Sequence, residues 1–109
     1  MSNGAWIDPM SLNIIGSTQP QLSVGTIAAM AQELQDSNRA DVFWQNSLKN
    51  DGPIEIWEIN NQRFLYNGNH RWHAAIAAGV SIPAVNLRIV QRPGCTIPTW
   101  SLNSLTRIP

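Results

Sequence analysis

The stretch FLYNGNHRWHAAIAAGV, from Phe64 to Val80, decides the fold. It opens with apolar and aromatic residues typical of a strand, and after Asn67-Gly68 it continues with small and apolar residues at helical spacing. The pattern predicts a strand that ends at Asn67-Gly68. It also predicts a helix of about two and a half turns that begins at Asn69 and stops at Gly79.

The junction between this strand and this helix is rich in hydrogen-bonding groups. The first amides of a helix have no partner within the helix, and the helix dipole favours an anion beside them. Gly68 lets a ligand approach the backbone closely, Arg71 offers a fork of donors that suits phosphate oxygens, and His70 can transfer a proton near neutral pH. We therefore expect a phosphate-binding site formed by Asn67, Gly68, Asn69, His70 and Arg71.

A purely structural explanation of the junction also stays open. Asn67-Gly68 is a common turn and Asn69 is a common N-cap residue. Arg71 has three candidate carboxylate partners, which are Asp51, Glu55 and Glu58. His73 lies among alanines one turn further on, so we expect a half-buried core histidine there and keep it only as a secondary candidate for the site.

Length and composition limit the class of protein. A chain of 109 residues fits one domain with a modest core. Apolar residues make up 43% of the chain and charged residues only 13%, with seven acids balancing seven bases. A neutral chain has no broad electrostatic surface for nucleic acid, so recognition of phosphate has to be local. Four arginines are the candidates for a local track, namely Arg63, Arg71, Arg88 and Arg92.

Cysteine usage and hydropathy exclude further classes. Cys95 is the single cysteine, so neither an intramolecular disulfide nor a zinc cluster of cysteines can form, and its Pro- and Gly-rich surroundings predict a structural loop thiol. No apolar run approaches the roughly 18 residues of a membrane span, and the N-terminus lacks a signal peptide. We therefore expect no membrane partner.

The remaining patterns predict the other elements. They are a strand over 12–15, a helix from the Ser23 cap to residues 36–38, a connector over 40–53, a hairpin over 54–66 that turns at Asn60-Asn61, and a strand over 84–90. This order predicts an α/β (α+β) domain with a small mixed β-sheet and flanking helices. We expect one domain over 1–109, with a core over about 10–90 and a C-terminal tail over 91–109 that docks through Trp100 and Leu102. Most of the five tryptophans are expected in the core.

The segment YNGNHRWHAAIAAGVSIPAVNLRIV (66–90) resembles the signature of the ParB/sulfiredoxin superfamily. In that family a strand ends in an Asp-Gly-(His or Asn)-His-Arg motif, and an alanine-rich helix, a Gly, an Ile-Pro and a strand follow. Upstream, the helix and the GPIEIWEINNQ hairpin strand (52–62) match at the level of pattern only. The resemblance covers roughly residues 10–90.

The resemblance implies that the junction acts on nucleotide phosphates or nucleic-acid backbones, with Gly68, His70 and Arg71 as the phosphate-binding core. Asn69 stands where sulfiredoxin carries its catalytic cysteine, which excludes reduction of cysteine sulfinic acid. Asn67 stands where many members carry Asp, so an acid has to come from elsewhere. We expect that acid to be Glu58, with Glu55 as the alternative.

Glu55 and Glu58 are three residues apart on one strand, so their side chains point to opposite faces and at most one reaches the site. The alternative that both only solvate the hairpin stays open.

The layout also resembles the toxin modules of bacterial polymorphic and contact-dependent toxins. It implies an effector that acts on a phosphate-containing substrate in the bacterial cytoplasm, delivered as part of a larger secreted protein and opposed by a cognate immunity protein. A nuclease acting on DNA or RNA is the first expectation, and nucleotide hydrolysis or phosphotransfer is the second.

In the expected mechanism, Arg71 and the helix amides stabilise the charge that develops on a phosphoryl group. His70 acts as the general acid and base. Asn67 and Asn69 position the substrate, and a divalent metal such as Mg²⁺ is a candidate cofactor. The alternatives are a non-catalytic nucleotide- or protein-binding module and a structural adaptor.

Overall fold

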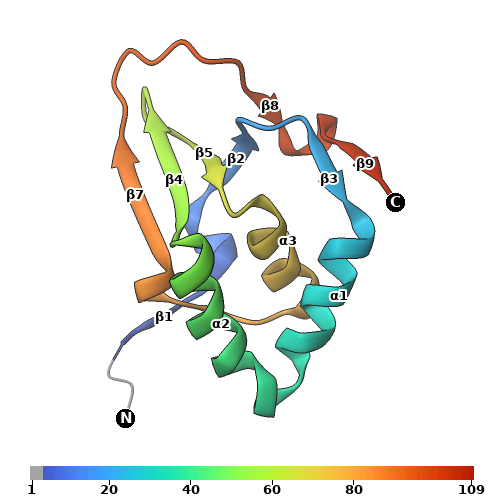
Figure 1. Ribbon diagram of the computed structural model, residues 1–109. Helices are drawn as coiled ribbons and strands as arrows, with labels where there is room; N and C mark the ends of the chain where they lie inside the picture. Colours follow the sequence, from blue (N-terminus) through green and yellow to red (C-terminus); the bar gives the residue numbers. More distant parts are fainter. Residues whose placement is uncertain (1–3) are drawn as a thin grey trace.

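The computed structural model describes residues 4–109, so residues 1–3 of the predicted domain lie outside the described range (Figure 1). A five-stranded sheet has the order β7–β4–β5–β2–β8. Its strands are β2 (Ile14–Ser17), β4 (Ile54–Ile59), β5 (Gln62–Asn67), β7 (Leu87–Gln91) and β8 (Trp100–Ser101). β5 is antiparallel to β4 and parallel to β2, and β7 is parallel to β4. The predicted α/β class with a mixed sheet is confirmed.

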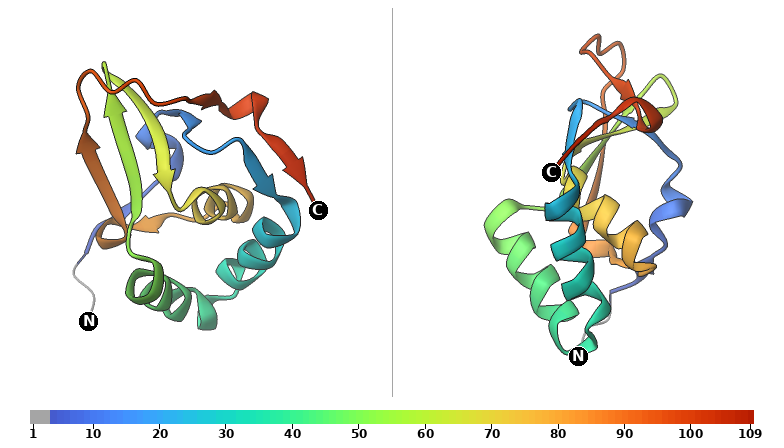
Figure 2. Two further views of the ribbon diagram at one scale, coloured as in Figure 1. Left: turned by 45° about the horizontal axis from the view of Figure 1, so that its top comes forward. Right: turned by 90° about the vertical axis from the view of Figure 1, so that its right-hand side faces the viewer.

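Three helices and two small ladders complete the fold. The helices are α1 (Val24–Gln35), α2 (Ser37–Asp51) and α3 (Asn69–Ala78). β1 (Trp6–Ile7) pairs with β6 (Ile82–Pro83), and β3 (Gln21–Ser23) pairs with β9 (Thr106–Ile108). α3 lies between the main sheet and the β3–β9 ladder, and α1 packs against it (Figures 1 and 2).

The hairpin and the helix after it form as predicted. Asn60 and Asn61 make the turn between β4 and β5, with φ values of 52° and 67° that asparagine tolerates better than most residues. α3 begins at Asn69 and ends at Gly79, whose φ of 69° is typical of a glycine C-cap. The strand and the helix are therefore joined by Gly68 alone.

Apolar residues cover both faces of the hairpin. Ile54, Ile56 and Leu65 are fully buried against the helices in the larger core. Trp57, Ile59 and Phe64 form a second cluster, against which Val90 and Cys95 pack. Cys95 thus contributes to packing, as expected for a structural thiol.

The predicted connector over 40–53 is wrong, because Ser37–Asp51 is a helix. Asp36 begins it by accepting a hydrogen bond from the Asn38 N–H at 2.9 Å, and Gly52 ends it with a φ of 76°. Most residues of this helix are polar, and its buried residues are Trp44 and Ser47, so the apolar pattern in its sequence is weak. Ala40, Phe43, Trp44 and Leu48 do have helical spacing, so the signal was present but weak.

Two strands begin later than predicted. Pro9–Leu12 form a 3₁₀ turn and Asn13 has a φ of 55°, so β2 starts at Ile14. β2 then continues through Gly16, where a Cβ would collide with the carbonyl oxygen of Trp100 on β8. Ala84–Asn86 form another 3₁₀ turn, which delays β7 until Leu87.

The C-terminal segment is an integral part of the fold. β8 forms one edge of the main sheet, and β9 pairs with β3 beside the N-terminus of α1. Leu102 packs against the core, as predicted, and Leu105 is buried.

The tryptophans divide between core and surface. Trp44, Trp57 and Trp72 are buried, and Trp100 is half-buried. Trp6 is 49% exposed and does not belong to the core. Within residues 4–109, no helix has both the length and the apolar character needed to cross a membrane.

We predict that Trp44→Ala destabilises the protein by about 3–5 kcal/mol, because truncating a buried aromatic leaves a cavity. Chemical denaturation measures this change. Val42 is 52% exposed on the same helix, so Val42→Ala is the matched control and should change stability by less than about 0.5 kcal/mol. Equal effects of the two substitutions would contradict the observed orientation of α2.

Candidate phosphate-binding site

The N-terminus of α3 is open to a ligand. Gly68 is the N-cap residue, and no side chain makes a capping hydrogen bond there. The intrahelical bonds start with the Trp72 N–H, which donates to the Gly68 carbonyl at 3.0 Å. The amides of the preceding helical residues have no partner within the helix, and unpaired amides of this kind can bind an anion.

A hollow of about 230 Å³ lies at this helix terminus. All five residues predicted to bind phosphate line it, and they are Asn67, Gly68, Asn69, His70 and Arg71. Gln19, Met30 and Asp51 complete the lining. The structure thus brings the predicted group together around one hollow.

Arg71 is a buried cation without a carboxylate partner. Its side chain is only 4% exposed, and its Nη1 donates to the Gly52 carbonyl oxygen at 2.6 Å. Within residues 4–109 this is its one hydrogen bond, and no carboxylate forms an ion pair with it. Burial lowers the pKa of Arg71, while the charge of Asp51 raises it. Because arginine stays protonated and a buried unpaired charge is costly, an anion in the hollow would stabilise this side chain.

Gly68 makes room for the guanidinium. Its φ is 85°, and a Cβ there would lie 2.8 Å from Ile54 Cγ1 and 2.9 Å from Arg71 Nη2. A larger residue would therefore meet both backbone strain and the side chain that faces the ligand. The glycine is required for two independent reasons.

His70 joins α3 to the start of α1. The backbone N–H of Ser23 donates to His70 Nε2 at 2.9 Å, so this nitrogen is an acceptor and the proton of the neutral ring is on Nδ1. Ser23 also caps α1 by accepting from the Thr26 N–H at 3.2 Å, and its hydroxyl donates to the Pro109 carbonyl at 3.3 Å. Proton transfer through Nε2 would require His70 to release Ser23.

Asn69 holds the segment between β2 and β3. It is 3% exposed, its Oδ1 accepts from the Ser17 hydroxyl, and its Nδ2 donates to Gln19 Oε1 at 3.3 Å. Ser17 Oγ also accepts from the Gln19 N–H at 3.0 Å. The Asn69 side chain therefore positions Gln19, which also lines the hollow, while its backbone amide belongs to the first turn of α3.

Asn67 and Asp51 close the side next to α2. Asn67 Nδ2 donates to the Asp51 backbone carbonyl at 3.3 Å, and Asp51 is among the residues that line the hollow. The sequence alone indicates Asp51 only as a candidate partner of Arg71. Because the β4–β5 hairpin pairs Glu55 with Asn67, the residues just before β4 lie beside the junction, and this pairing is what brings Asp51 to the hollow.

Glu58 is not part of the site. It pairs with Arg63 across the hairpin at 2.9 Å and accepts from Gln91 at 2.6 Å, at the end of β4 remote from Gly68. Arg63 and Asn67 are four residue steps apart along β5, which is roughly 13 Å. The hydrogen bonds from Gln91 and Arg63 lower the pKa of Glu58, opposite to what a general acid needs.

Glu55 also has a structural partner. Its Oε2 accepts from Trp57 Nε1 at 2.7 Å, and it lines none of the hollows described in this section. Neither Glu55 nor Glu58 lines the hollow at α3, whereas Asp51 does.

The four candidate arginines do not form one track. Arg63 pairs with Glu58, and the Arg92 guanidinium lies 4.2 Å from the centre of the Trp57 ring. Arg88 is exposed on β7, whereas Arg71 is buried at α3. Of the four, only Arg71 lies at the N-terminus of α3.

His73 is half-buried one turn into α3, as expected, and does not line the hollow. Its Nδ1 lies 2.8 Å from the Asn69 carbonyl oxygen, and its ring contacts Trp72 edge to face. Burial lowers the pKa of His73, and the charges of Arg107 and His70 lower it further, against the raising effect of the Asn69 carbonyl. His73 is a structural residue.

Two further hollows extend the site into a groove. One of about 340 Å³ shares Gln19 and His70 with it and reaches Ile108 on β9. Another of about 210 Å³ shares Met30, Asp51 and Arg71 with it and reaches α2. A ligand bound at the α3 amides therefore has space on both sides.

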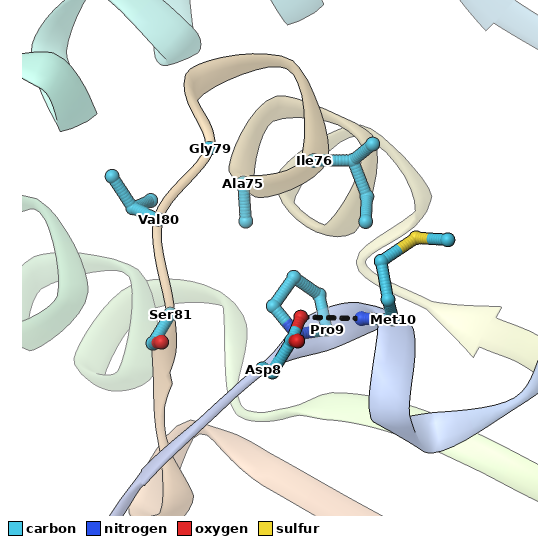
Figure 3. A pocket seen from close by; sticks show the side chains of 8 residues that line it. All are labelled: Asp8, Pro9, Met10, Ala75, Ile76, Gly79, Val80 and Ser81. Atoms are coloured by element: carbon cyan, nitrogen blue, oxygen red, sulfur yellow. Dashed lines mark hydrogen bonds between the residues drawn. The ribbon is translucent and has the colours of Figure 1, made fainter.

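A separate hollow of about 290 Å³ lies at the opposite end of α3, where Asp8, Pro9 and Met10 face Ala75, Ile76 and the segment 79–81 (Figure 3). The Asp8 carboxylate at its rim accepts from the Met10 N–H at 2.9 Å. The C-terminal end of a helix and a carboxylate both disfavour an anion. Each hollow has one aspartate in its lining, so the two ends of α3 differ in the sign of the helix dipole and in the presence of Arg71.

The side chains near Arg71 could hold a magnesium ion only together with a bound phosphate. No group of three or more His, Cys, Asp or Glu side chains suited to a metal occurs within residues 4–109. Asp51 is the carboxylate of the hollow, and Mg²⁺ is often held by one or two carboxylates together with substrate phosphates and water. Asp51 would therefore hold such an ion jointly with a bound phosphate.

No protein-family model matches the chain, and neither does any curated protein. The resemblance to the ParB/sulfiredoxin superfamily therefore remains a prediction, and the functional argument depends on the geometry of the site.

We predict that Gly68→Ala lowers the unfolding free energy more than Gly79→Ala. Both residues have positive φ, so each substitution incurs a conformational cost of about 1–2 kcal/mol, but nothing lies within 4 Å of a Cβ at Gly79. The contacts with Ile54 and Arg71 should add roughly 1–3 kcal/mol at Gly68. Equal losses in denaturation experiments would show that Gly68 is needed for its backbone conformation alone.

We predict a loss of stability below pH 6.5 that depends on His73. The folded protein lowers the pKa of His73 below its usual 6.5, so the unfolded chain binds more protons in this range. The stabilisation from neutral His73 is complete above pH 6.5 and is lost as the pH falls from 6.5 through the lower pKa of the folded state. Unfolding free energies at pH 7.5 and 5.5 should differ less in His73→Gln than in the wild type. An unchanged difference would show that the loss of stability at acidic pH does not come from His73.

Proposed function

We propose that this domain binds the phosphate of a nucleotide or nucleic acid at the N-terminus of α3. The observation that carries the proposal is the buried guanidinium of Arg71, which lines the hollow and has no carboxylate partner within residues 4–109. The adjacent helix amides supply further donors without side-chain caps. Together they form a cradle for a group with a negative charge and several oxygen acceptors.

Hydrolysis of a phosphate ester is the second candidate, and the position of Asp51 favours it. Asp51 lines the same hollow as the proposed phosphate, and its carboxylate would orient an attacking water there. Arg71 and the α3 amides would stabilise the charge that develops on the phosphoryl oxygens. We propose this activity, as a nuclease or a nucleotide hydrolase, for a toxin-type effector that a cognate immunity protein restrains.

Binding without turnover is the first choice because of His70. Its Nε2 is engaged by the Ser23 amide, and Glu58 is remote, so the expected pair of acid and base is not assembled. Asp51 would have to act with His70 only after the latter is released from Ser23.

We predict that Arg71→Gln weakens binding of pyrophosphate and ATP by about tenfold to a hundredfold, because it removes charge-assisted hydrogen bonds. Isothermal titration calorimetry measures the affinities. Arg88→Gln is the matched control, since Arg88 is exposed on β7 and outside the groove. Unchanged binding in folded Arg71→Gln, or an equal loss in Arg88→Gln, would remove the basis of the proposed site.

We predict that Asp51→Asn separates binding from turnover. If the domain is a hydrolase, the wild type cleaves plasmid DNA, RNA, ATP or CTP in the presence of magnesium, and Asp51→Asn binds but does not cleave. Asp41→Asn, an exposed carboxylate on the same helix, is the control and should keep full activity. Expression of the wild type should then slow bacterial growth, and expression of Asp51→Asn should not. Absence of turnover in all assays would contradict the hydrolase and favour the binding module.

A further inference from the structure

We infer that the contact between α3 and the start of α1 is a pH-dependent latch, which opens when the His70 ring takes up a second proton. The latch is the hydrogen bond from the Ser23 backbone N–H to His70 Nε2, with a length of 2.9 Å. Nε2 accepts this bond only while it carries no proton. In an imidazolium both ring nitrogens are donors, so the protonated ring and the Ser23 amide have no acceptor between them and the bond is lost.

The latch joins α3 to two other elements at a single residue. Ser23 is the last residue of β3, which pairs with β9, and it is also the N-cap of α1, where its hydroxyl accepts from the Thr26 N–H at 3.2 Å. Within residues 4–109 the half-buried His70 ring makes no second hydrogen bond that would hold it after release. Opening therefore separates α3 from the β3–α1 junction, while the cap of α1 stays in place.

Charged groups on three elements act on the state of the latch. On α3, Arg71 shares a hollow with His70. Burial lowers the pKa of the neighbouring His73, and the charges of Arg107 on β9 and of His70 lower it further, so these groups lie within electrostatic reach of one another. Asp51, at the end of α2, lines the same hollow as His70. The cations favour the neutral ring and a closed latch, whereas Asp51 favours the imidazolium.

The remaining neighbours of the ring carry no charge. In the hollow of about 340 Å³ next to the ring they are Gln19, Pro20, Gln21, Ser23 and Ile108, and in the α3 hollow α1 contributes Met30. An anion at the α3 amides would favour the imidazolium, so anion binding and opening of the latch would strengthen each other. This coupling rests on the proposed function, whereas the latch itself requires no ligand.

Hydrogen exchange and NMR titration of the ligand-free protein between about pH 8 and 5 test the latch. The protection of the Ser23 amide, corrected for intrinsic exchange, should fall about tenfold over the range in which the His70 ring gains its proton. The Trp72 N–H, which donates to the Gly68 carbonyl at 3.0 Å, is the internal reference and should lose less protection.

Three results of this titration would overturn the latch. Equal losses at Ser23 and Trp72 would indicate general destabilisation. A Ser23 amide that stays protected while His70 is protonated would show that the bond does not depend on the proton. A His70 ring that stays neutral over the whole range would leave nothing to open the latch.

His70→Gln supplies an acceptor that does not titrate, because an amide oxygen can replace Nε2. In this variant the protection of Ser23 should change by less than about twofold over the same range. His73→Gln is the matched control, since His73 is also half-buried on α3 but lies against the Asn69 carbonyl, and it should keep the wild-type fall. A wild-type fall in His70→Gln would assign the effect to another group. The wild-type titration decides alone if His70→Gln does not fold.

Sulfate tests the coupling to the proposed site, because its charge stays constant in this range. Calorimetry should show that the wild type binds sulfate about fivefold or more tightly at pH 5.5 than at pH 7.5, and that His70→Gln loses most of this difference. Equal affinities at the two pH values would overturn the coupling. If sulfate binds at neither pH while the Ser23 amide behaves as predicted, the proposed anion site is overturned and the latch stands.

Discussion

The burial of the Arg71 guanidinium is the constraint on which the rest of the site depends. The side chain donates to the Gly52 carbonyl after α2 and passes close to Gly68 before α3. It therefore links the end of one helix to the start of another across the hairpin between them. No carboxylate among the described residues forms an ion pair with it, and the charge of Asp51 is the one that raises its pKa.

The residues around Arg71 divide into those that hold the fold and those that face a ligand. Asn69 binds Ser17 and Gln19, and His70 accepts from the amide of Ser23, so both side chains attach α3 to distant segments. Their backbone amides, however, remain at the open end of the helix. We therefore attribute the proposed phosphate binding mostly to the backbone and Arg71, which would allow a neutral chain to recognise an anion locally.

The sequence carried strong signals for this junction and weak ones for its surroundings. The Asn-Gly turn, the alanine-rich run and Gly79 predicted β5, α3 and the hollow's central residues, because each is a local backbone preference. α2 was missed because its buried face is small. Glu58 was misplaced because strand position alone does not tell which end of a hairpin meets the helix; the pairing of Glu55 with Asn67 decides it. Asp51 and Gln19 reach the site only through tertiary contacts, so local patterns gave no reason to choose Gln19.

Chemical-shift mapping of the backbone amides during titration with pyrophosphate tests the central claim most directly. The account predicts that the amides of Asn69, His70 and Arg71 shift first and most, together with the Arg71 side-chain Nε–H, and that these shifts saturate together. Saturable shifts that are confined to residues outside the α3 N-terminus, such as Arg88 or the segment after β7, would contradict it, as would the absence of any shift at these three amides.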